Sequence, residues 1–94
     1  MASESPERLE ELRERFLVAL YEVAGGVGAG RTAAVSAVGQ QAGLDPEGNP
    51  QDRALCERLK SELVESGYVS AEAGPSGQLA VTEDGARAIG RGQT

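Results

Sequence analysis

The stretch Phe16–Thr32, FLVALYEVAGGVGAGRT, decides the fold, because its apolar run can be either a buried strand or the end of a helix. If the run is a strand, the segment Gly25–Thr32 differs by one letter from the glycine-rich loop that binds phosphate between a strand and a helix. If the run is helical, the glycines only connect two elements. The periodicity of the residues upstream distinguishes the two interpretations.

Apolar residues upstream of the glycines recur at spacings of three and four, which is typical of one face of a helix. They are Leu9, Leu12, Phe16, Leu20 and Val23. Ser5 is a suitable N-cap, and Pro6 suits the first helical position. The sequence therefore predicts a helix over residues 6–24. Gly25 and Gly26 end it, because glycine readily takes the left-handed conformation found after helix C-termini.

The glycine-rich segment is therefore interpreted as a connector. A phosphate-binding loop needs a buried strand before it, and the basic residue here is Arg31 where a lysine is usual. A chain of 94 residues is also too short for the parallel sheet and flanking helices of a P-loop nucleotide hydrolase. We predict no bound nucleotide and no cofactor.

The composition indicates a folded chain with an acidic balance. Hydrophobic residues make up 39% and charged residues 26%, which is typical of a globular domain and too apolar for a disordered one. The 9 Lys and Arg residues stand against 15 Asp and Glu, which gives a formal net charge of −6. Because nucleic acid is a polyanion, this balance counts against nucleic-acid binding.

The chain has one cysteine and no histidine, so the sequence predicts neither an internal disulfide nor a Cys/His metal cluster. Its first residues, MASESPERLEELRER, lack the basic start and apolar stretch of a secretory signal. No apolar run approaches the roughly 20 residues of a membrane helix. We therefore expect a cytoplasmic protein that holds no metal and makes no membrane contact.

A second helix is predicted over residues 32–42, directly after the connector. Val35, Val38 and Ala42 share one face of it, and Gly43 follows as a stop. Its many small residues allow it to pack close to a neighbouring element.

The third helix is predicted from a cap, an apolar stripe and a stop. It follows a turn over residues 44–49, in which Asn49 can cap the helix and Pro50 can take its first position. Its apolar face is a stripe of leucines at a spacing of four, formed by Leu55, Leu59 and Leu63. Gly67 ends the helix.

The apolar period changes from helical to extended after the third helix. Residues 68–73 and 78–81 are predicted to be strands of a β-hairpin with a turn at 74–77, and Thr82 can cap a short final helix. Because a two-stranded hairpin is rarely stable alone, all elements should share one core. The expected core residues are Leu9, Leu12, Phe16, Leu20, Val35, Val38, Leu44, Leu55, Leu59, Leu63, Val69, Leu79, Val81 and Ile89.

Three of these segments together resemble the winged helix-turn-helix domain of MarR-type and PadR-type transcriptional regulators. The similarity lies in QQAGL at residues 40–44, RALCERLKSELVESGYV at residues 53–69 and LAVTEDGARAI at residues 79–89. In those regulators the third helix ends near Gly-Tyr/Leu-Val, and the wing leads into a Thr-x-x-Gly turn. The resemblance implies an α+β fold with a three-helix core, a C-terminal two-stranded β-hairpin wing and a short final helix.

The resemblance also implies a non-enzymatic role in gene regulation. The winged-helix domain would cover residues 6–90, between flexible termini at residues 1–5 and 91–94. The third helix would lie in the major groove of double-stranded DNA, and the wing would reach the backbone or the minor groove. The candidate contacts to DNA or to a partner are Gln51, Arg53, Glu57, Arg58 and Ser61, with Arg31 and Lys60 as candidates for backbone contacts.

The charges leave open a second hypothesis from a different class. The predicted third helix carries Arg53, Arg58 and Lys60 against four carboxylates, and residues 68–82 contain an acidic residue but no Lys or Arg. Because DNA affinity comes largely from cations that displace counterions at phosphates, such a wing adds little to it. The alternative is a winged helix that contacts protein, as a homodimer or within a larger assembly, and does not bind DNA.

An enzyme is disfavoured, because the chain has no histidine, no nucleophile with a recognisable base, and carboxylates scattered along solvent faces. Cys56 lies in helical register with Leu59 and Leu63, which favours a small buried hydrophobe. The alternative for Cys56 is a redox-sensing thiol whose pKa Arg53 and Lys60 would lower.

Overall fold

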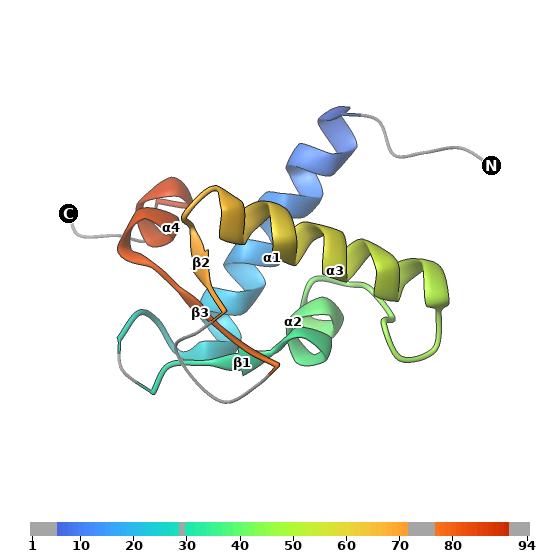
Figure 1. Cartoon of the computed structure of the whole chain (residues 1–94), viewed down its shortest axis with the longest axis horizontal. Coiled ribbons are helices and arrows are strands. Elements are labelled where there is room, and N and C mark those ends of the chain that lie inside the picture. Colours follow the sequence, from blue (N-terminus) through green and yellow to red (C-terminus); the bar gives the residue numbers. More distant parts are fainter. Residues whose placement is uncertain (1–5, 29, 72–76, 91–94) are drawn as a thin grey trace.

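The computed structural model describes residues 6–28, 30–71 and 77–90, which form a small α+β domain with four helices and a three-stranded antiparallel sheet (Figure 1). The elements in chain order are α1 (Pro6–Ala24), β1 (Ala33–Ala34), α2 (Val35–Gln41), α3 (Pro50–Glu65), β2 (Val69–Ser70), β3 (Gln78–Val81) and α4 (Glu83–Ala88). The predicted flexible termini, 1–5 and 91–94, lie outside the described residues.

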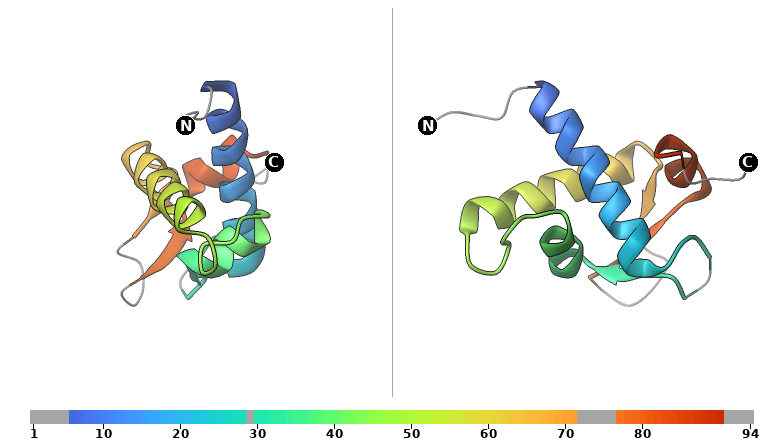
Figure 2. Two further views of the ribbon diagram at one scale, coloured as in Figure 1. Left: turned by 90° about the vertical axis from the view of Figure 1, so that its right-hand side faces the viewer. Right: turned by 180° about the vertical axis from the view of Figure 1, so that it is seen from behind.

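Helix α1 has the bounds that its apolar period predicts. It crosses behind α3 in Figure 1, and its N-terminal turns extend beyond the rest of the domain, as the view from behind in Figure 2 also shows. Leu17 and Ala19, on either side of the predicted stripe, are buried too, because α2, α3 and β3 all pack against this helix. Val23 shares the predicted apolar stripe but is not among the expected core residues, and it is 41% exposed; the last turn presents Ala24 to the core.

The glycine-rich segment follows a helix, as predicted, but it leads into a strand. β1 pairs antiparallel with β3, with Ala33 opposite Leu79, and β3 pairs antiparallel with β2, so the strand order is β1-β3-β2. The predicted start of the second helix at residue 32 is therefore wrong, since α2 begins only at Val35. The sequence does not reveal β1, because two alanines are too short to show an alternating pattern. It does not reveal the start of α2 either, because the N-cap residue, Ala34, has no side chain that can cap the helix.

The connection from α2 to α3 follows the turn and cap that the sequence predicts. Gly43 has a φ of 94°, which ends α2, and the backbone N–H of Gly48 donates to Asp45 Oδ1 at 3.1 Å within the turn. The Asn49 side chain accepts from the backbone N–H of Gln51 at 2.9 Å and so caps α3. α3 then begins at Pro50, as predicted.

Most of the predicted core is buried in one cluster to which all the helices and all three strands contribute. Four expected members are only half-buried and pack on its edge: Val35, Leu44, Leu55 and Ile89. The cluster also includes small residues that the apolar stripes did not single out, among them Ala33, Ala42 and Ala86. Small side chains of this kind allow close approach between neighbouring elements.

The end of α3, the start of β2 and α4 meet at one polar side chain. Thr82 Oγ1 donates to the Gly67 carbonyl oxygen at 2.6 Å and accepts from the backbone N–H of Gly85 at 3.0 Å. The backbone N–H of Thr82 donates to the Tyr68 carbonyl oxygen at 3.0 Å. We refer to Gly67, Tyr68, Thr82 and Gly85 as the Thr82 junction. The β2–β3 pair of the predicted hairpin is confirmed, whereas residues 72–76 of that hairpin lie outside the described residues.

Candidate functional site

Helix α3 presents one face to the core and the opposite face to solvent. Its buried residues are Cys56, Leu59 and Leu63. The residues on the opposite face are all exposed, and these form what we call the α3 stripe: Gln51, Ala54, Glu57, Arg58, Ser61 and Glu65. Because the helix runs Pro50–Glu65 without a break, the stripe is continuous along its length.

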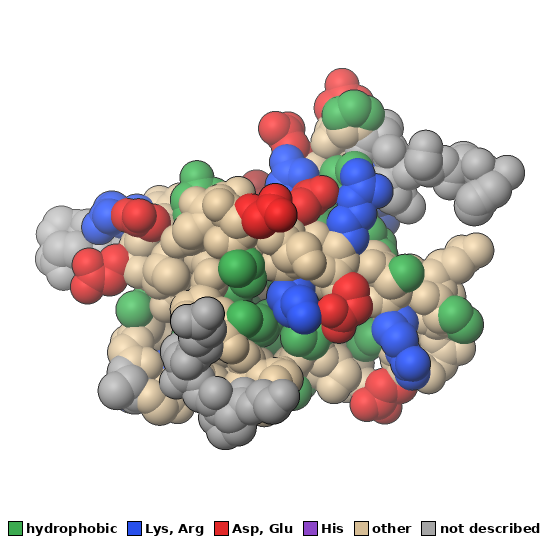
Figure 3. Space-filling view, in the orientation of Figure 1, with side chains coloured by type: hydrophobic (Ala, Val, Ile, Leu, Met, Phe, Trp, Pro, Cys, Tyr) green, Lys and Arg blue, Asp and Glu red, His purple; other side chains and the backbone are tan. Residues whose placement is uncertain are grey.

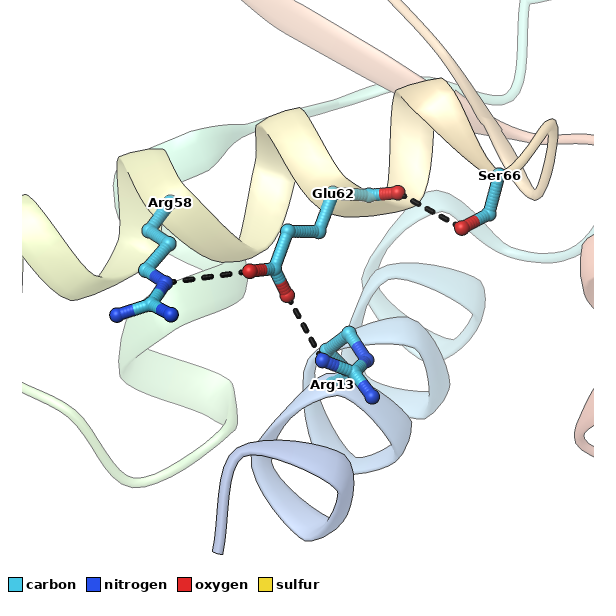
Figure 4. A network of polar contacts seen from close by, with 4 residues as sticks. All are labelled: Arg13, Arg58, Glu62 and Ser66. Atoms are coloured by element: carbon cyan, nitrogen blue, oxygen red, sulfur yellow. Dashed lines mark hydrogen bonds and ion pairs between the residues drawn. The ribbon is translucent and has the colours of Figure 1, made fainter. Parts of the chain in front are cut away.

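Arg58 is held within a network that links α3 to α1 (Figure 4). Its Nε donates to Glu62 Oε2 at 3.1 Å, while Nη1 of Arg13 donates to the other carboxylate oxygen, Oε1, at 2.8 Å. These two hydrogen bonds, with that from Arg13 first, lower the pKa of Glu62 below the ordinary glutamate value. Glu62 thus joins the two helices and is shared by two guanidinium groups.

The other two cations of α3 are also engaged. Lys60 Nζ lies 2.9 Å from Glu57 Oε1, and Nε of Arg53 donates to the Pro46 carbonyl oxygen at 3.2 Å. On the face drawn in Figure 3, which carries α3, the described Lys and Arg side chains alternate with Asp and Glu rather than merging into one basic patch. This face of the domain is therefore a surface of mixed charge and not a uniformly positive one (Figure 3).

The structure does not bring Arg31 to the α3 stripe. Arg31 belongs to the connector between α1 and β1, which Figures 1 and 2 place away from the N-terminal end of α3. Its side chain lies over Gly25, where a Cβ would come within 3.1 Å of the Arg31 Nη1 atom. Arg31 therefore lies apart from the α3 stripe, and its role as a DNA-backbone contact stays a prediction.

Cys56 is a buried residue at the contact between α2 and α3. Its side chain is 1% exposed, and a Cβ on Gly39 would come within 2.6 Å of its Sγ. Burial raises the pKa of the Cys56 thiol, and the Asp52 and Glu57 carboxylates raise it further. The hypothesis that Arg53 and Lys60 lower this pKa is wrong, because burial of the thiol and the two neighbouring carboxylates shift it in the opposite direction.

Glu62 and Arg13 are not among the predicted site residues, although part of their network has a sequence signal. The spacing of Arg58 and Glu62 by four residues is a readable signal for their ion pair. The link from Glu62 to Arg13 spans 49 positions, and no local pattern reports it. Only the crossing of α1 over α3 brings these two side chains together.

Comparison with protein-family models, with curated proteins and with solved structures finds no match to this chain. In the described part of the chain, no helix has both the length and the apolar character that crossing a membrane requires. The same residues contain no group of three or more His, Cys, Asp or Glu side chains arranged to hold a metal ion.

Proposed function

We propose that this chain is a winged-helix domain of a DNA-binding transcriptional regulator, with α3 as its recognition helix. The observation that carries the proposal is the α3 stripe, which faces solvent along the helix while the opposite face is buried. A recognition helix enters the major groove with such an exposed face. The antiparallel β2–β3 pair that follows α3 supports the proposal, because it stands where the wing is expected.

Arg58 is the residue of the stripe best suited to contact a base or a phosphate. Its side chain is 56% exposed, and an exposed ion pair at a spacing of four contributes only about 0.3–0.5 kcal/mol. A bidentate contact from arginine to guanine contributes about 1–3 kcal/mol. When Arg58 leaves, Glu62 keeps its hydrogen bond from Arg13, so no carboxylate loses its last partner. DNA can therefore recruit Arg58 at little cost.

The few cations of α3 limit how strongly binding depends on salt. Arg53, Arg58 and Lys60 can neutralise one phosphate each. Each neutralised phosphate adds about −0.9 to the slope of log affinity against log salt concentration. We expect a slope no steeper than about −3, and binding that is measured most readily at low salt.

The test is fluorescence anisotropy of a labelled random-sequence duplex titrated with the protein at low salt. Arg58→Ala should weaken binding about tenfold, as expected for losing one arginine contact. Arg15→Ala is the matched control, because Arg15 is 48% exposed and also pairs with a glutamate four residues away, but on α1. If the protein fails to bind the duplex even at low salt, or if both variants weaken binding equally, the proposal is wrong.

The second candidate is protein contact through the same stripe, and the engaged cations favour it. Arg58 and Lys60 each pair with a carboxylate of their own helix, and such alternating charge complements a mixed protein surface better than a polyanion. Ala54→Arg separates the candidates, because it adds a cation within the N-terminal part of the stripe. The variant should bind the duplex more tightly if α3 faces DNA. If α3 pairs with a second copy, it should instead lose a concentration-dependent increase of mass in analytical ultracentrifugation.

A further inference from the structure

A groove lies between the N-terminal half of α1, the C-terminal end of α3 and α4. It has a volume of about 540 Å³ and is open to solvent along its length. Its apolar surface is formed by Tyr68, Ala88 and Ile89, which lie over the buried side chains of Leu17 and Leu63. The groove exists because α1 extends past α3 and α4, as Figures 1 and 2 show, so its first turns have a neighbour on one side only.

The α1 wall of the groove is acidic and largely unpaired. Glu7, Glu10, Glu11 and Glu14 line it. Glu11 has Arg8 at 3.5 Å and Arg15 at 3.8 Å, but no ion pair within the described residues reaches the other three. Arg13, the one cation among the lining residues, is turned to Glu62 on α3. The wall therefore presents three carboxylates without a counterion from the described part of the domain.

This arrangement of glutamates is unfavourable for the isolated helix. Glu10 and Glu14 are like charges at a spacing of four, which destabilises a helix by a few tenths of a kcal/mol. The repulsion between Glu7 and Glu11 is partly offset, because Glu11 pairs with Arg8 and Arg15. The helix dipole favours acidic residues only within the first turn, so it compensates for Glu7 but not for Glu14. A cation bound in the groove would relieve the repulsion along this wall.

We propose that this groove binds a basic amphipathic helix of a partner protein. Leucine-sized side chains of that helix would pack on the apolar part of the groove, and flanking Lys or Arg would pair with Glu10 and Glu14. The open shape suits a helix face rather than an enclosed small molecule. A second copy of this chain is a poor occupant, because its net charge of −6 would bring acidic surfaces together. The residues that line the groove are not members of the α3 stripe, and the proposal does not depend on DNA binding.

The probe is a capped synthetic peptide of Leu and Lys with its leucines on one helical face, and a permuted peptide of the same composition is its control. Each is titrated into the ¹⁵N-labelled full chain and followed by amide chemical shifts. The patterned peptide should move the amides of Leu17, Ala88 and Ile89 and bind more tightly than the permuted one. Shifts centred elsewhere, or equal binding of both peptides, would show attraction to net charge alone and overturn the proposal.

Two matched substitutions place the site. Ala88→Lys puts a cation in the groove at an exposed position in the last turn of α4, where the helix dipole tolerates it, and Ala54→Lys makes the same change on the exposed face of α3. Ala88→Lys should lower the affinity for the peptide about tenfold or more, because the new lysine repels the peptide at short range. Ala54→Lys should lower that affinity by less than about twofold. Equal effects would contradict a site in the groove.

A second pair of variants tests the acidic wall without touching its apolar part. Glu10→Gln with Glu14→Gln should weaken the peptide about fivefold, the effect of two partly exposed ion pairs. Glu22→Gln with Glu47→Gln changes the net charge equally at residues that do not line the groove, and should have little effect.

If wild-type mass in ultracentrifugation rises with concentration, and Ala88→Lys abolishes that rise, the occupant is a second copy and the proposed partner is wrong.

Discussion

The two ends of α3 are packed in different ways, although a glycine makes each contact possible. In its N-terminal half, Gly39 of α2 lies against the Cys56 side chain. Just beyond its C-terminal end, Gly85 of α4 lies against the backbone carbonyl of Tyr68, where a Cβ would overlap the oxygen. The first contact is with atoms that a rotamer change or a substitution can move. The second is with main chain that the Thr82 junction holds in place.

A glycine in a close contact can therefore have either of two structural roles. A glycine facing a side chain sets a local packing distance, and its neighbour can give way. A glycine facing a fixed carbonyl determines whether two elements can dock at all, because the main chain cannot repack without breaking hydrogen bonds. We therefore expect the C-terminal end of α3 to respond more severely to the same substitution.

Gly85→Ala should have the largest effect on stability. The new methyl group would overlap the Tyr68 carbonyl oxygen, which also accepts the backbone N–H of Thr82 at 3.0 Å. We expect the free energy of unfolding in urea to fall by about 3 kcal/mol, the upper part of the usual range for overpacking. The Thr82 amide should also exchange with deuterium faster, because that hydrogen bond must lengthen.

Gly90→Ala distinguishes this clash from a general sensitivity at the end of α4. Gly90 has a φ of 73°, and among the described residues no heavy atom beyond its own neighbours lies within 4 Å of a Cβ placed there. An alanine at Gly90 should cost about 1–2 kcal/mol through its left-handed backbone alone. If Gly85→Ala lowers the free energy of unfolding no more than Gly90→Ala does, the Tyr68 carbonyl is not held rigidly against Gly85.

Gly39→Ala should have a smaller effect, and one that a second substitution relieves. The methyl group would come within 2.6 Å of Cys56 Sγ and 3.1 Å of Pro46 Cγ. We expect a loss of about 1–2 kcal/mol, since alanine's better helix propensity offsets part of the overlap. In a double-mutant cycle with Cys56→Ala, the two losses should be less than additive by about 1 kcal/mol, because the sulfur is gone. Strict additivity would show that the overlap with Cys56 is not the cause.

Thr82→Ala tests the side chain that holds the C-terminal contact together. It removes the hydroxyl that donates to the Gly67 carbonyl and caps α4 at Gly85. The expected loss is about 1–2 kcal/mol, as for other N-caps. Thr82→Ser keeps the hydroxyl and should cost well under half as much. A loss as large for serine as for alanine would assign the effect to the methyl group instead.

The long helices were predictable because their signals are local. α1 and α3 combine an apolar period with a proline start and a glycine stop, and for α3 the Asn49 cap was visible as well. The sheet was only half predictable. β2 and β3 are close in sequence, whereas β1 is two alanines that become a strand only by pairing with β3. Nothing within residues 33–34 themselves distinguishes this strand from the first turn of α2.

For the candidate surface, exposure was predictable and pairing was not. The spacing of the leucine stripe leaves Gln51, Arg58 and Ser61 on the opposite face of α3, and all three are exposed. It could not show that Arg58 shares Glu62 with Arg13, nor that the start of α1 leaves an acidic groove, because both depend on how α1 crosses α3. The angle between two helices is set by side-chain packing over the whole core, and a linear pattern does not encode it.

Glu62→Gln should have the smallest effect and the clearest dependence on pH, since Glu62 links α3 to α1 through side chains about one third exposed. At neutral pH we expect a loss below about 1 kcal/mol. The folded state lowers the pKa of Glu62, so its stabilisation is fully present above the ordinary glutamate pKa of about 4.3 and is lost as the pH falls through the lower folded value. The stability curves of wild type and variant should therefore converge in acid, with Glu65→Gln on the same helix as the control. If the variant is still less stable than the wild type in acid, Glu62 acts through packing, and its ion pairs do not stabilise the contact between α1 and α3.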